Sequence, residues 1–342
     1  MSSKKYNAAI IGASGYTSSE LIRLIHNHPN IVIKSLVGNT KVDNEVDEIY
    51  SYLKFKKLSK IIHLNDVNFE EIDIVFCCLP HGETKKIISR IPGNIKIIDL
   101  SSDYRISSEA TYNKFYDSNF DKTYINESAY GLSEINKKKI KNARIIACPG
   151  CFPTSILLPL IPLVENNQIK KERIIIDAKT GISGAGRKAI TKSLFCEINE
   201  NFIPYNINKH RHLAEIFEQL NVSERNVQFT PQIIPVSRGI MSVIYAESDK
   251  TASDVRSFIK EYYKDEFFIK INKEGNIPVL RNVTATNFCE ISIVESNITG
   301  QIIIFSVVDN LTKGSSGQAI QNFNLINDLN EDTGLNNISI YP

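Results

Sequence analysis

The chain has 342 residues, 42% of them hydrophobic, which is enough for two domains with apolar cores. It carries 40 Lys and Arg against 38 Asp and Glu, a net charge of +2, and the basic residues are dispersed rather than gathered into a nucleic-acid surface. There is no signal peptide and no apolar run long enough to cross a membrane. Its six cysteines show no disulfide-like spacing. We therefore expect a cytoplasmic protein without membrane or nucleic-acid partners.

The first half of the chain alternates predicted strands and helices. An apolar run at residues 6–11 leads into a glycine-containing turn, and residues 19–27 then have helical spacing. Further along we expect strands at 31–37, 72–79 and 95–100 and a helix at 83–89. This alternation predicts an α/β fold, a Rossmann-type doubly wound parallel sheet, for a nucleotide-binding domain over residues 1–150.

The second half has a different pattern, typical of an α+β domain with a mainly antiparallel sheet. The expected strands are 174–178, 232–236, 240–247, 287–294 and 301–308, and the expected helices are 156–164, 213–220 and 252–263. We assign residues 151–312 to this catalytic and dimerisation domain. A last helix over 313–330 is expected to return to the first domain.

The turn after the first strand predicts a phosphate site. Gly12 permits a tight turn, and Gly15 lets backbone N–H groups approach a pyrophosphate at the start of a helix. Ser18 stands where the dinucleotide pattern has its third glycine and still permits close packing of helix on strand. The residues placed at this cofactor site are Gly12, Ser14, Gly15, Tyr16 and Thr17.

The end of the second predicted strand decides between the two nicotinamide cofactors. No acidic residue stands within residues 35–41 to bind a ribose 2′-hydroxyl. The hydroxyl side chains of this segment and Lys41 suit a 2′-phosphate better. The sequence therefore predicts NADP (NADPH) rather than NAD.

Cys151 is the candidate nucleophile. A strand-like run at 144–147 leads into a Pro-Gly turn, and Pro153 suits the first turn of the helix that follows. A thiol at a helix N-terminus is stabilised as the thiolate. Two other interpretations are a buried structural cysteine and a redox pair with Cys148 in a C-x-x-C motif.

Several short motifs occur together in one order. They are Gly12-Ala13-Ser14-Gly15-Tyr16-Thr17, Asp99-Leu100-Ser101-Ser102-Asp103-Tyr104-Arg105, Pro149-Gly150-Cys151-Phe152-Pro153-Thr154, Gly181-Ile182-Ser183-Gly184-Ala185-Gly186-Arg187, His210-Arg211-His212 with Glu215, and Asp309-Asn310-Leu311 with Lys313-Gly314. Through this set the chain resembles the N-acetyl-γ-glutamyl-phosphate reductases, which are relatives of the aspartate-semialdehyde dehydrogenases.

The resemblance implies NADPH-dependent reduction of N-acetyl-γ-glutamyl phosphate to N-acetylglutamate 5-semialdehyde, with release of phosphate, on the route to arginine. It also implies a cytoplasmic homo-oligomer, either a homodimer or a homotetramer. In this reaction the Cys151 thiolate attacks the acyl carbon and expels phosphate, and the resulting thioester accepts hydride. The reaction needs a small-molecule acyl phosphate and no metal.

The same motifs supply acid–base candidates. His210 and His212 flank Arg211 just before a predicted helix, and either ring could stabilise the thiolate and later protonate the substrate oxygen. The sequence does not decide between the two. Glu215 could orient the chosen ring, or it could be a first-turn acid favoured by the helix dipole.

Three arginines are the expected anion ligands. Arg105 is assigned to the substrate phosphate, since a guanidinium binds such groups bidentately, although a structural ion pair with Asp99 or Asp103 is the alternative. Arg211 is assigned to the substrate α-carboxylate and Arg187 to a further anion contact.

The remaining expected contacts are with the cofactor. Ser183 and Gly184 lie in a second flexible turn that we place against the nicotinamide or the substrate. Asn310, at the end of an apolar strand, is expected to bind the nicotinamide amide.

Two other functions stay open at this point. One is a related reductase that acts on a carrier-protein-linked acyl phosphate in lysine biosynthesis, which would need a basic entrance that the sequence does not display. The other is a non-catalytic NAD(P)-binding redox sensor that uses Cys148 and Cys151. The acyl-phosphate motifs argue against a sensor, because a sensor has no use for them.

Overall fold

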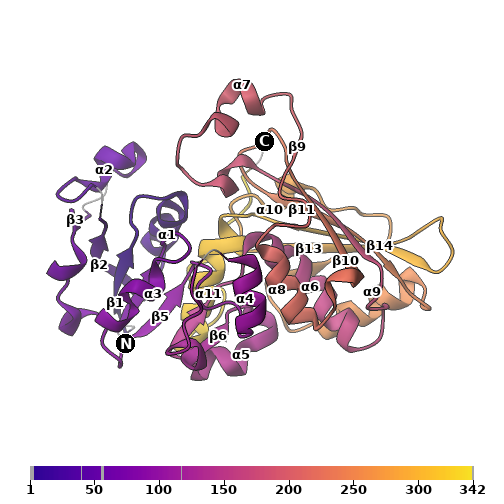
Figure 1. The fold of residues 1–342 in the computed structure, drawn as a ribbon, viewed down its shortest axis with the longest axis horizontal. Helices are drawn as coiled ribbons and strands as arrows, with labels where there is room; N and C mark the ends of the chain where they lie inside the picture. The colour runs from indigo at the N-terminus through magenta and orange to yellow at the C-terminus, as the bar shows by residue number, and fades with distance from the viewer. Residues whose placement is uncertain (1–3, 40, 55–57, 117, 341–342) are drawn as a thin grey trace. The chain divides into compact units, whose positions relative to one another are not determined.

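The structure is a computed structural model that describes residues 4–39, 41–54, 58–116 and 118–340 (Figure 1). The chain forms two compact units. The first unit comprises Met1–Ser107, Phe120–Pro149 and Ser315–Asn336, and the second comprises Ser108–Asn119, Gly150–Gly314 and Asn337–Pro342. The segment near the C-terminus therefore belongs to the first unit although it follows the second in sequence.

The first unit is built on a parallel sheet of seven strands in the order β3-β2-β1-β4-β5-β7-β6. The strands are β1 (Tyr6–Ile11), β2 (Ile31–Val37), β3 (Ile61–Ile62), β4 (Ile74–Cys77), β5 (Lys96–Asp99), β6 (Ser128–Tyr130) and β7 (Ile145–Ala147). All neighbouring strands run parallel, and the order reverses at β1. The predicted doubly wound fold is confirmed, with a switch point beside the glycine turn.

The helices of the first unit are amphipathic or buried, as a doubly wound sheet requires. Their bounds are α1 (Tyr16–His26), α2 (Val46–Ile49), α3 (Thr84–Ile87), α5 (Ser133–Asn142) and α11 (Gly317–Ile326). Helix α1 buries Leu21, Ile22, Leu24 and Ile25 at helical spacing. Helix α11 packs against α1, α5 and β5, so the returning segment completes the layer on that face.

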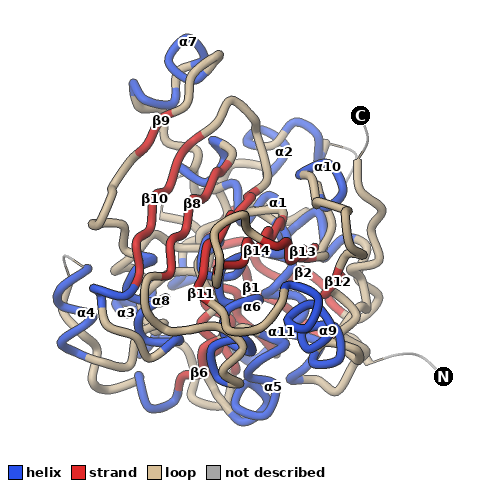
Figure 2. Tube along the Cα trace, turned by 90° about the vertical axis from the view of Figure 1, so that its right-hand side faces the viewer, coloured by secondary structure: helices blue, strands red, loops and turns tan. Residues whose placement is uncertain are grey.

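The second unit contains a mixed sheet of seven strands in the order β12-β13-β14-β11-β8-β10-β9. The strands are β8 (Ile174–Thr180), β9 (Ile203–Pro204), β10 (Val227–Ile233), β11 (Ile240–Glu247), β12 (Ile269–Ile271), β13 (Cys289–Glu295) and β14 (Gln301–Val308). Strands β13, β14, β11 and β8 are antiparallel in succession, whereas β8 and β10, which lie side by side in Figure 2, are parallel.

The two faces of this second sheet differ. Its helices are α4 (Glu109–Phe115), α6 (Cys151–Glu165), α7 (Phe195–Ile198), α8 (His212–Leu220), α9 (Ala252–Tyr262) and α10 (Leu280–Val283). Helices α6 and α9 pack on β11, β13 and β14. Along β11, Ile240, Ser242, Ile244 and Ala246 are buried, while the residues between them are only partly buried. These partly buried residues of β11, together with the exposed Ile175 of β8, lie on the face of the sheet that remains accessible in the single chain.

Helix α6 is the central helix of the second unit. It is apolar on all sides, and residues 152–164 are buried without exception. Its two internal prolines, Pro159 and Pro162, have no N–H to donate to the preceding turn. The Tyr263 hydroxyl donates instead to the carbonyl oxygen of Leu158, at 2.5 Å, the acceptor that an N–H at position 162 would have used.

Three element boundaries differ clearly from the sequence-based expectation. The strand expected at 232–236 is β10, which begins at Val227 and runs through Pro231, a residue that normally argues against a sheet interior. The helix expected over 313–330 begins only at Gly317, because residues 312–316 form a π-helical turn. The helix expected from residue 156 begins at Cys151, since Pro153 fits the first turn.

The Gly12 turn gives a stability prediction. Gly12 has φ +91°, and a Cβ there would lie 2.5 Å from the Cys78 carbonyl oxygen, a backbone atom that cannot turn away. We expect Gly12→Ala to destabilise the protein by about 2 kcal/mol or more, a fall in Tm of roughly 4–8 °C. Thermal unfolding followed by circular dichroism measures the change. In the control Gly93→Ala the new Cβ meets no described atom within 4 Å. Equal Tm values for both variants would contradict the prediction.

Candidate active site

Cys151 is the first residue of α6, and Gly150 is the N-cap of that helix. The Gly150 carbonyl oxygen accepts hydrogen bonds from the Thr154 N–H, at 2.9 Å, and from the Thr154 hydroxyl, at 3.0 Å. Cys151 is half-buried, and its position at the N-terminus of a fifteen-residue helix favours the thiolate. Cys151 therefore lies at a helix N-terminus as predicted, although the helix itself was expected only from residue 156.

Gly314 packs directly against Cys151. A Cβ placed on Gly314 would lie 2.9 Å from Cys151 Cβ and 3.2 Å from Cys151 Cα, closer than side-chain carbons normally approach. Only glycine therefore permits the observed contact at this position. The sequence showed the Lys313-Gly314 motif but gave no reason for the glycine.

Side chains of helix α8 contact Gly150, the residue before Cys151. The Gly150 N–H donates to the fully buried Glu215 carboxylate at 2.9 Å. A Cβ on Gly150 would lie 2.4 Å from His212 Nε2, so the imidazole lies against the Gly150 backbone. The second unit thus brings together Cys151, His212 and Glu215, which the sequence placed in two separate motifs.

His210 occupies an aromatic pocket next to His212. Its ring centroid lies 4.6 Å from that of His212, and the rings of Phe152, Tyr205 and Phe229 are 5.4–5.7 Å away. Burial, assisted by the positive charge of Arg211, lowers the pKa of His210 to about 4. At neutral pH the ring is uncharged, and its Nδ1 accepts the His212 backbone N–H at 3.1 Å.

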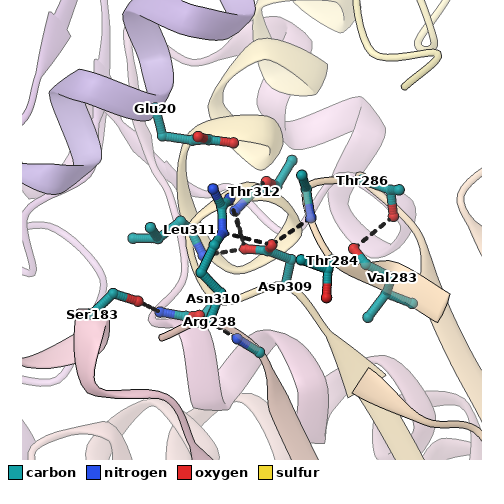
Figure 3. A network of polar contacts seen from close by, with 12 residues as sticks. Glu20, Ser183, Arg238, Val283, Thr284, Thr286, Asp309, Asn310, Leu311 and Thr312 are labelled. Atoms are coloured by element: carbon teal, nitrogen blue, oxygen red, sulfur yellow. Dashed lines mark hydrogen bonds and ion pairs between the residues drawn. The ribbon is translucent and has the colours of Figure 1, made fainter. Parts of the chain in front are cut away.

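The turn after β8 is joined to the end of β14 (Figure 3). The Asn310 Nδ2 amide donates to the Ser183 hydroxyl at 2.9 Å, and the Gly239 N–H donates to Asn310 Oδ1 at 2.7 Å. Gly184 lies close by, since a Cβ on it would be 3.8 Å from Asn310 Nδ2. Asn310 therefore shapes the Ser183–Gly184 turn, and one N–H of its amide remains for the predicted nicotinamide contact.

The predicted anion ligands fall into both units. Arg187 and Arg211 are exposed on the second unit. Arg105 belongs to the first unit, is mostly buried, and donates from Nη2 to the Leu100 carbonyl oxygen at 3.0 Å. In the same unit, burial and the neighbouring Asp103 carboxylate raise the pKa of Asp99 to about 6.

The glycine turn of the first unit has the geometry of a phosphate site. Gly15 is the N-cap of α1, and no described atom lies within 4 Å of the place where its Cβ would be. The Ser18 hydroxyl accepts the Gly15 N–H at 3.0 Å and donates to the Gly15 carbonyl oxygen at 2.8 Å. Ser18 therefore caps the helix, a role that its comparison with a third glycine did not suggest.

The other residues predicted at this turn also lie at the start of α1. Tyr16 begins the helix and is 40% exposed, and the Thr17 carbonyl oxygen accepts the Ser316 hydroxyl at 2.8 Å. Ser14 is half-buried in the turn itself. Beyond β2, Lys41 is exposed, while Thr40, one of the hydroxyl residues of that segment, lies outside the described residues.

Cys148 has the environment of a structural thiol. It is fully buried, burial raises its pKa to about 12, and Asn322 Nδ2 lies 3.6 Å from its sulfur. Such a thiol is a poor nucleophile and a poor partner for disulfide exchange. No disulfide joins Cys148 to Cys151.

The described part of the chain shows neither a cluster of metal ligands nor a membrane-spanning helix. Within it, no three His, Cys, Asp or Glu side chains are gathered as a metal site would require. None of its helices combines the length and the apolar character needed to cross a bilayer.

Comparison with known proteins gives consistent matches over both units. Residues 7–143 match the family described as semialdehyde dehydrogenase, NAD binding domain, and residues 151–310 match semialdehyde dehydrogenase, dimerisation domain. An N-acetyl-gamma-glutamyl-phosphate reductase of Caldicellulosiruptor saccharolyticus is 43% identical over 96% of this chain and 97% of its own. A probable chloroplastic enzyme of the same name from Arabidopsis thaliana is 41% identical over 99% of this chain and 86% of its own.

Solved structures share the fold at lower sequence identity. Aspartate semialdehyde dehydrogenase II of Vibrio cholerae has a TM-score of 0.73 at 17% identity and covers 95% of this chain and 99% of its own. Aspartate semialdehyde dehydrogenase of Candida albicans, solved with NADP, has a TM-score of 0.70 at 16% identity over 95% and 99% of the two chains.

The buried His210 gives a pH prediction. Its pKa is about 4 in the folded chain and near 6.5 when unfolded, so between these values only the unfolded chain binds the proton. The stability of the wild type should therefore fall as pH drops from about 6.5 to 4. The variant His210→Asn keeps an acceptor for the His212 N–H but has no imidazole to protonate. In that window we expect its free energy of unfolding to fall by about 1 kcal/mol per pH unit less than that of the wild type. Urea unfolding at several pH values measures this, and parallel curves would show the prediction to be wrong.

Proposed function

The chain belongs to the semialdehyde dehydrogenase family as an N-acetyl-γ-glutamyl-phosphate reductase, and on that premise we propose that Cys151 is the nucleophile of the reaction. The reaction reduces N-acetyl-γ-glutamyl phosphate in arginine biosynthesis. The observation that carries the proposal is the arrangement around Gly150. Its N–H is bound by Glu215 and its backbone is covered by His212, which fixes the next residue, Cys151, at the start of α6.

The first chemical step forms a thioester. The Cys151 thiolate attacks the acyl carbon, the C–O bond to phosphate breaks, and inorganic phosphate leaves with the electron pair. The partial positive charge at the N-terminus of α6 stabilises the attacking thiolate. Arg105 is assigned to the phosphate and Arg211 to the α-carboxylate, with Arg187 as a further anion ligand.

His212 is the better acid–base candidate of the two histidines. His210 is held neutral by its aromatic surroundings, and its Nδ1 already accepts the His212 backbone N–H. His212 presents Nε2 to the backbone of Gly150, one residue from the nucleophile. We assign to His212 Nε2 the proton that the hemithioacetal oxygen takes up once the thioester carbon is reduced, and that it gives back when the C–S bond breaks to release the aldehyde and the Cys151 thiolate. To Glu215 we assign the anchoring of the loop before α6.

The first unit is an NAD(P)-binding domain, and its glycine turn fits a dinucleotide. The open space beside Gly15 at the N-terminus of α1 suits a pyrophosphate, and Gly12, Ser14, Tyr16 and Thr17 form the rest of the turn. We propose NADPH, because β2 is followed by Lys41 and by no acidic residue up to that point. When bound, NADPH supplies the hydride that reduces the thioester carbon. Ser183, Gly184 and Asn310 are assigned to the nicotinamide side.

A second copy of the chain is the expected partner. Residues 151–310 match a dimerisation-domain model, and the second sheet has a partly apolar face that its own helices leave accessible. We propose that this face is covered in a homodimer or homotetramer. A cytoplasmic location is the corresponding expectation for a chain of this family.

The two alternative functions receive less support. A redox sensor based on the C-x-x-C motif would need a reactive Cys148, whereas burial raises the pKa of that thiol to about 12. A carrier-linked lysine reductase would need a basic docking surface, and the relatives compared above are named N-acetyl-gamma-glutamyl-phosphate reductases.

The reverse reaction tests the substrate and the nucleophile together. With N-acetylglutamate 5-semialdehyde, phosphate and NADP⁺, we expect phosphate-dependent NADPH formation by the wild type. Cys151→Ala should lose at least about 10³-fold in kcat and still bind NADPH, because only the covalent step is removed. Cys196→Ala, which removes an exposed cysteine of the same unit, is the matched control and should be unchanged. Turnover by Cys151→Ala would mean that another group is the nucleophile.

The cofactor proposal gives a separate prediction. We expect kcat/KM with NADPH to exceed that with NADH by about 10-fold or more, a difference near 1.4 kcal/mol. Lys41→Ala should reduce this ratio, since the lysine is assigned to the 2′-phosphate. Lys60→Ala, another exposed lysine of the first unit, should leave the ratio as it is. A preference for NADH in the wild type would overturn the proposal.

A further inference from the structure

Beyond the residues assigned above, the second unit contains a buried charge pair at the end of β14. Asp309 is fully buried, and Arg238 donates to both of its carboxylate oxygens, from Nε at 2.9 Å and from Nη2 at 3.1 Å (Figure 3). A bidentate pair of this kind fixes the orientation of both side chains. The Arg238 side chain is 23% exposed, so removing Arg238 would leave Asp309 as an uncompensated buried charge.

The same pair controls the backbone of the turn that follows β14. Asp309 Oδ1 accepts the N–H groups of Leu311, at 2.8 Å, and Thr312, at 3.1 Å, while Oδ2 accepts the Ala285 N–H at 2.6 Å. Arg238 Nη2 also donates to the Thr312 hydroxyl at 3.0 Å. These contacts hold the first residues of the π-helical turn Thr312–Ser316, a geometry that is rarely stable without support.

Within this turn, Gly314 contacts Cys151. The Gly314 N–H donates to the Asp309 carbonyl oxygen at 2.9 Å, so the position of Gly314 depends on that of Asp309. Gly314 in turn packs against the Cβ and Cα of Cys151, in the contact that excludes any side chain at residue 314. A displacement of the turn by a fraction of an ångström would therefore be transmitted to the Cys151 side chain, since packed atoms have no free space to absorb it.

We propose that Arg238 and Asp309 are positioning residues for Cys151, acting through Thr312 and Gly314. The inference rests on the proposed role of Cys151 as the nucleophile. Neither residue needs to touch the substrate, because the contact of the Gly314 backbone with Cys151 sets the direction of the thiol. Loss of the pair should lower kcat, by about 10- to 100-fold, more than it changes the KM for the substrate.

The experiment combines steady-state kinetics with peptide-resolved alkylation by iodoacetamide. Three cysteines of the second unit serve as reporters: Cys151 reads out the positioned thiol, the exposed Cys196 is an internal reference, and the buried Cys289 reports unfolding. We compare Arg238→Ala, Arg238→Lys, Thr312→Val and Gly314→Ala. The matched control is Arg256→Ala, which breaks an arginine–glutamate pair of α9 that does not involve the turn.

We expect Arg238→Ala to lower kcat and to change the rate of Cys151 alkylation and its pH profile, with Cys289 still protected. Arg238→Lys should recover part of the loss, because it keeps the charge but not the bidentate geometry. Gly314→Ala should change the same Cys151 signals, and the double variant should lose less than the sum of both effects on a free-energy scale, because both act through one contact. Arg256→Ala should resemble the wild type.

Two results would overturn the inference. One is a kcat within twofold of the wild type in folded Arg238→Ala, and the other is a lower kcat with unchanged Cys151 alkylation. If Arg238→Ala exposes Cys289, the variant Thr312→Val decides, since it removes the hydroxyl that accepts from Arg238 Nη2 and leaves the Arg238–Asp309 pair in place. It should then lower kcat by about threefold with altered Cys151 alkylation, and wild-type behaviour would refute the inference. Failure of the proposed function is a separate result, namely turnover by Cys151→Ala.

Discussion

The hydrogen bond between the Gly150 N–H and the Glu215 carboxylate governs the geometry of the second unit around Cys151. It ties the N-cap of α6 to α8, a helix that packs against α6. Because the Glu215 carboxylate is fully buried, this charged acceptor gains more from a backbone N–H than it would at the surface. His212 can then lie against Gly150, since α8 presents both side chains from its first turn. The position of the thiol follows from the two contacts together.

The His210-Arg211-His212 segment shows how one short sequence can produce two different imidazoles. His210 is surrounded by aromatic rings and lies beside a positive charge, so it remains neutral and acts as a hydrogen-bond acceptor for the backbone. His212, two residues later, turns toward the start of α6. Burial and neighbouring groups, rather than residue type, separate a structural histidine from an acid–base candidate.

Much of the fold could be predicted from periodicity alone. The bounds of β1, β2, β11 and β14 agree with the sequence-based expectation because these strands are dense in β-branched residues and end at glycine or polar residues. Strand β10 was placed several residues too late, since Pro231 resembles a strand breaker until the register with β8 is known. The very short strands β3, β6 and β9 are too short to show a periodic pattern, and they form only because they pair with a neighbouring strand of the sheet.

The candidate site was predictable only in part, for a related reason. Residue types that bear chemistry, such as Cys151 and His212, stand out in a sequence. Gly314 and Arg238 do not, because their importance lies in contacts between segments far apart in the chain. The capping role of Ser18 was likewise hidden, since a pattern that expects glycine treats serine as a weaker substitute.

The prolines of α6 bear on the order in which the protein folds. Proline is the poorest helix former, by about 3 kcal/mol in a helix interior, and α6 contains Pro159 and Pro162 in addition to Pro153. A segment of this composition cannot nucleate as an isolated helix. It becomes helical only when the sheet of the second unit and Tyr263 of the neighbouring segment are in place to accept it. The helix N-terminus at which Cys151 lies should thus form late in folding, and the electrostatic stabilisation that we propose for its thiolate is missing until the second unit has folded.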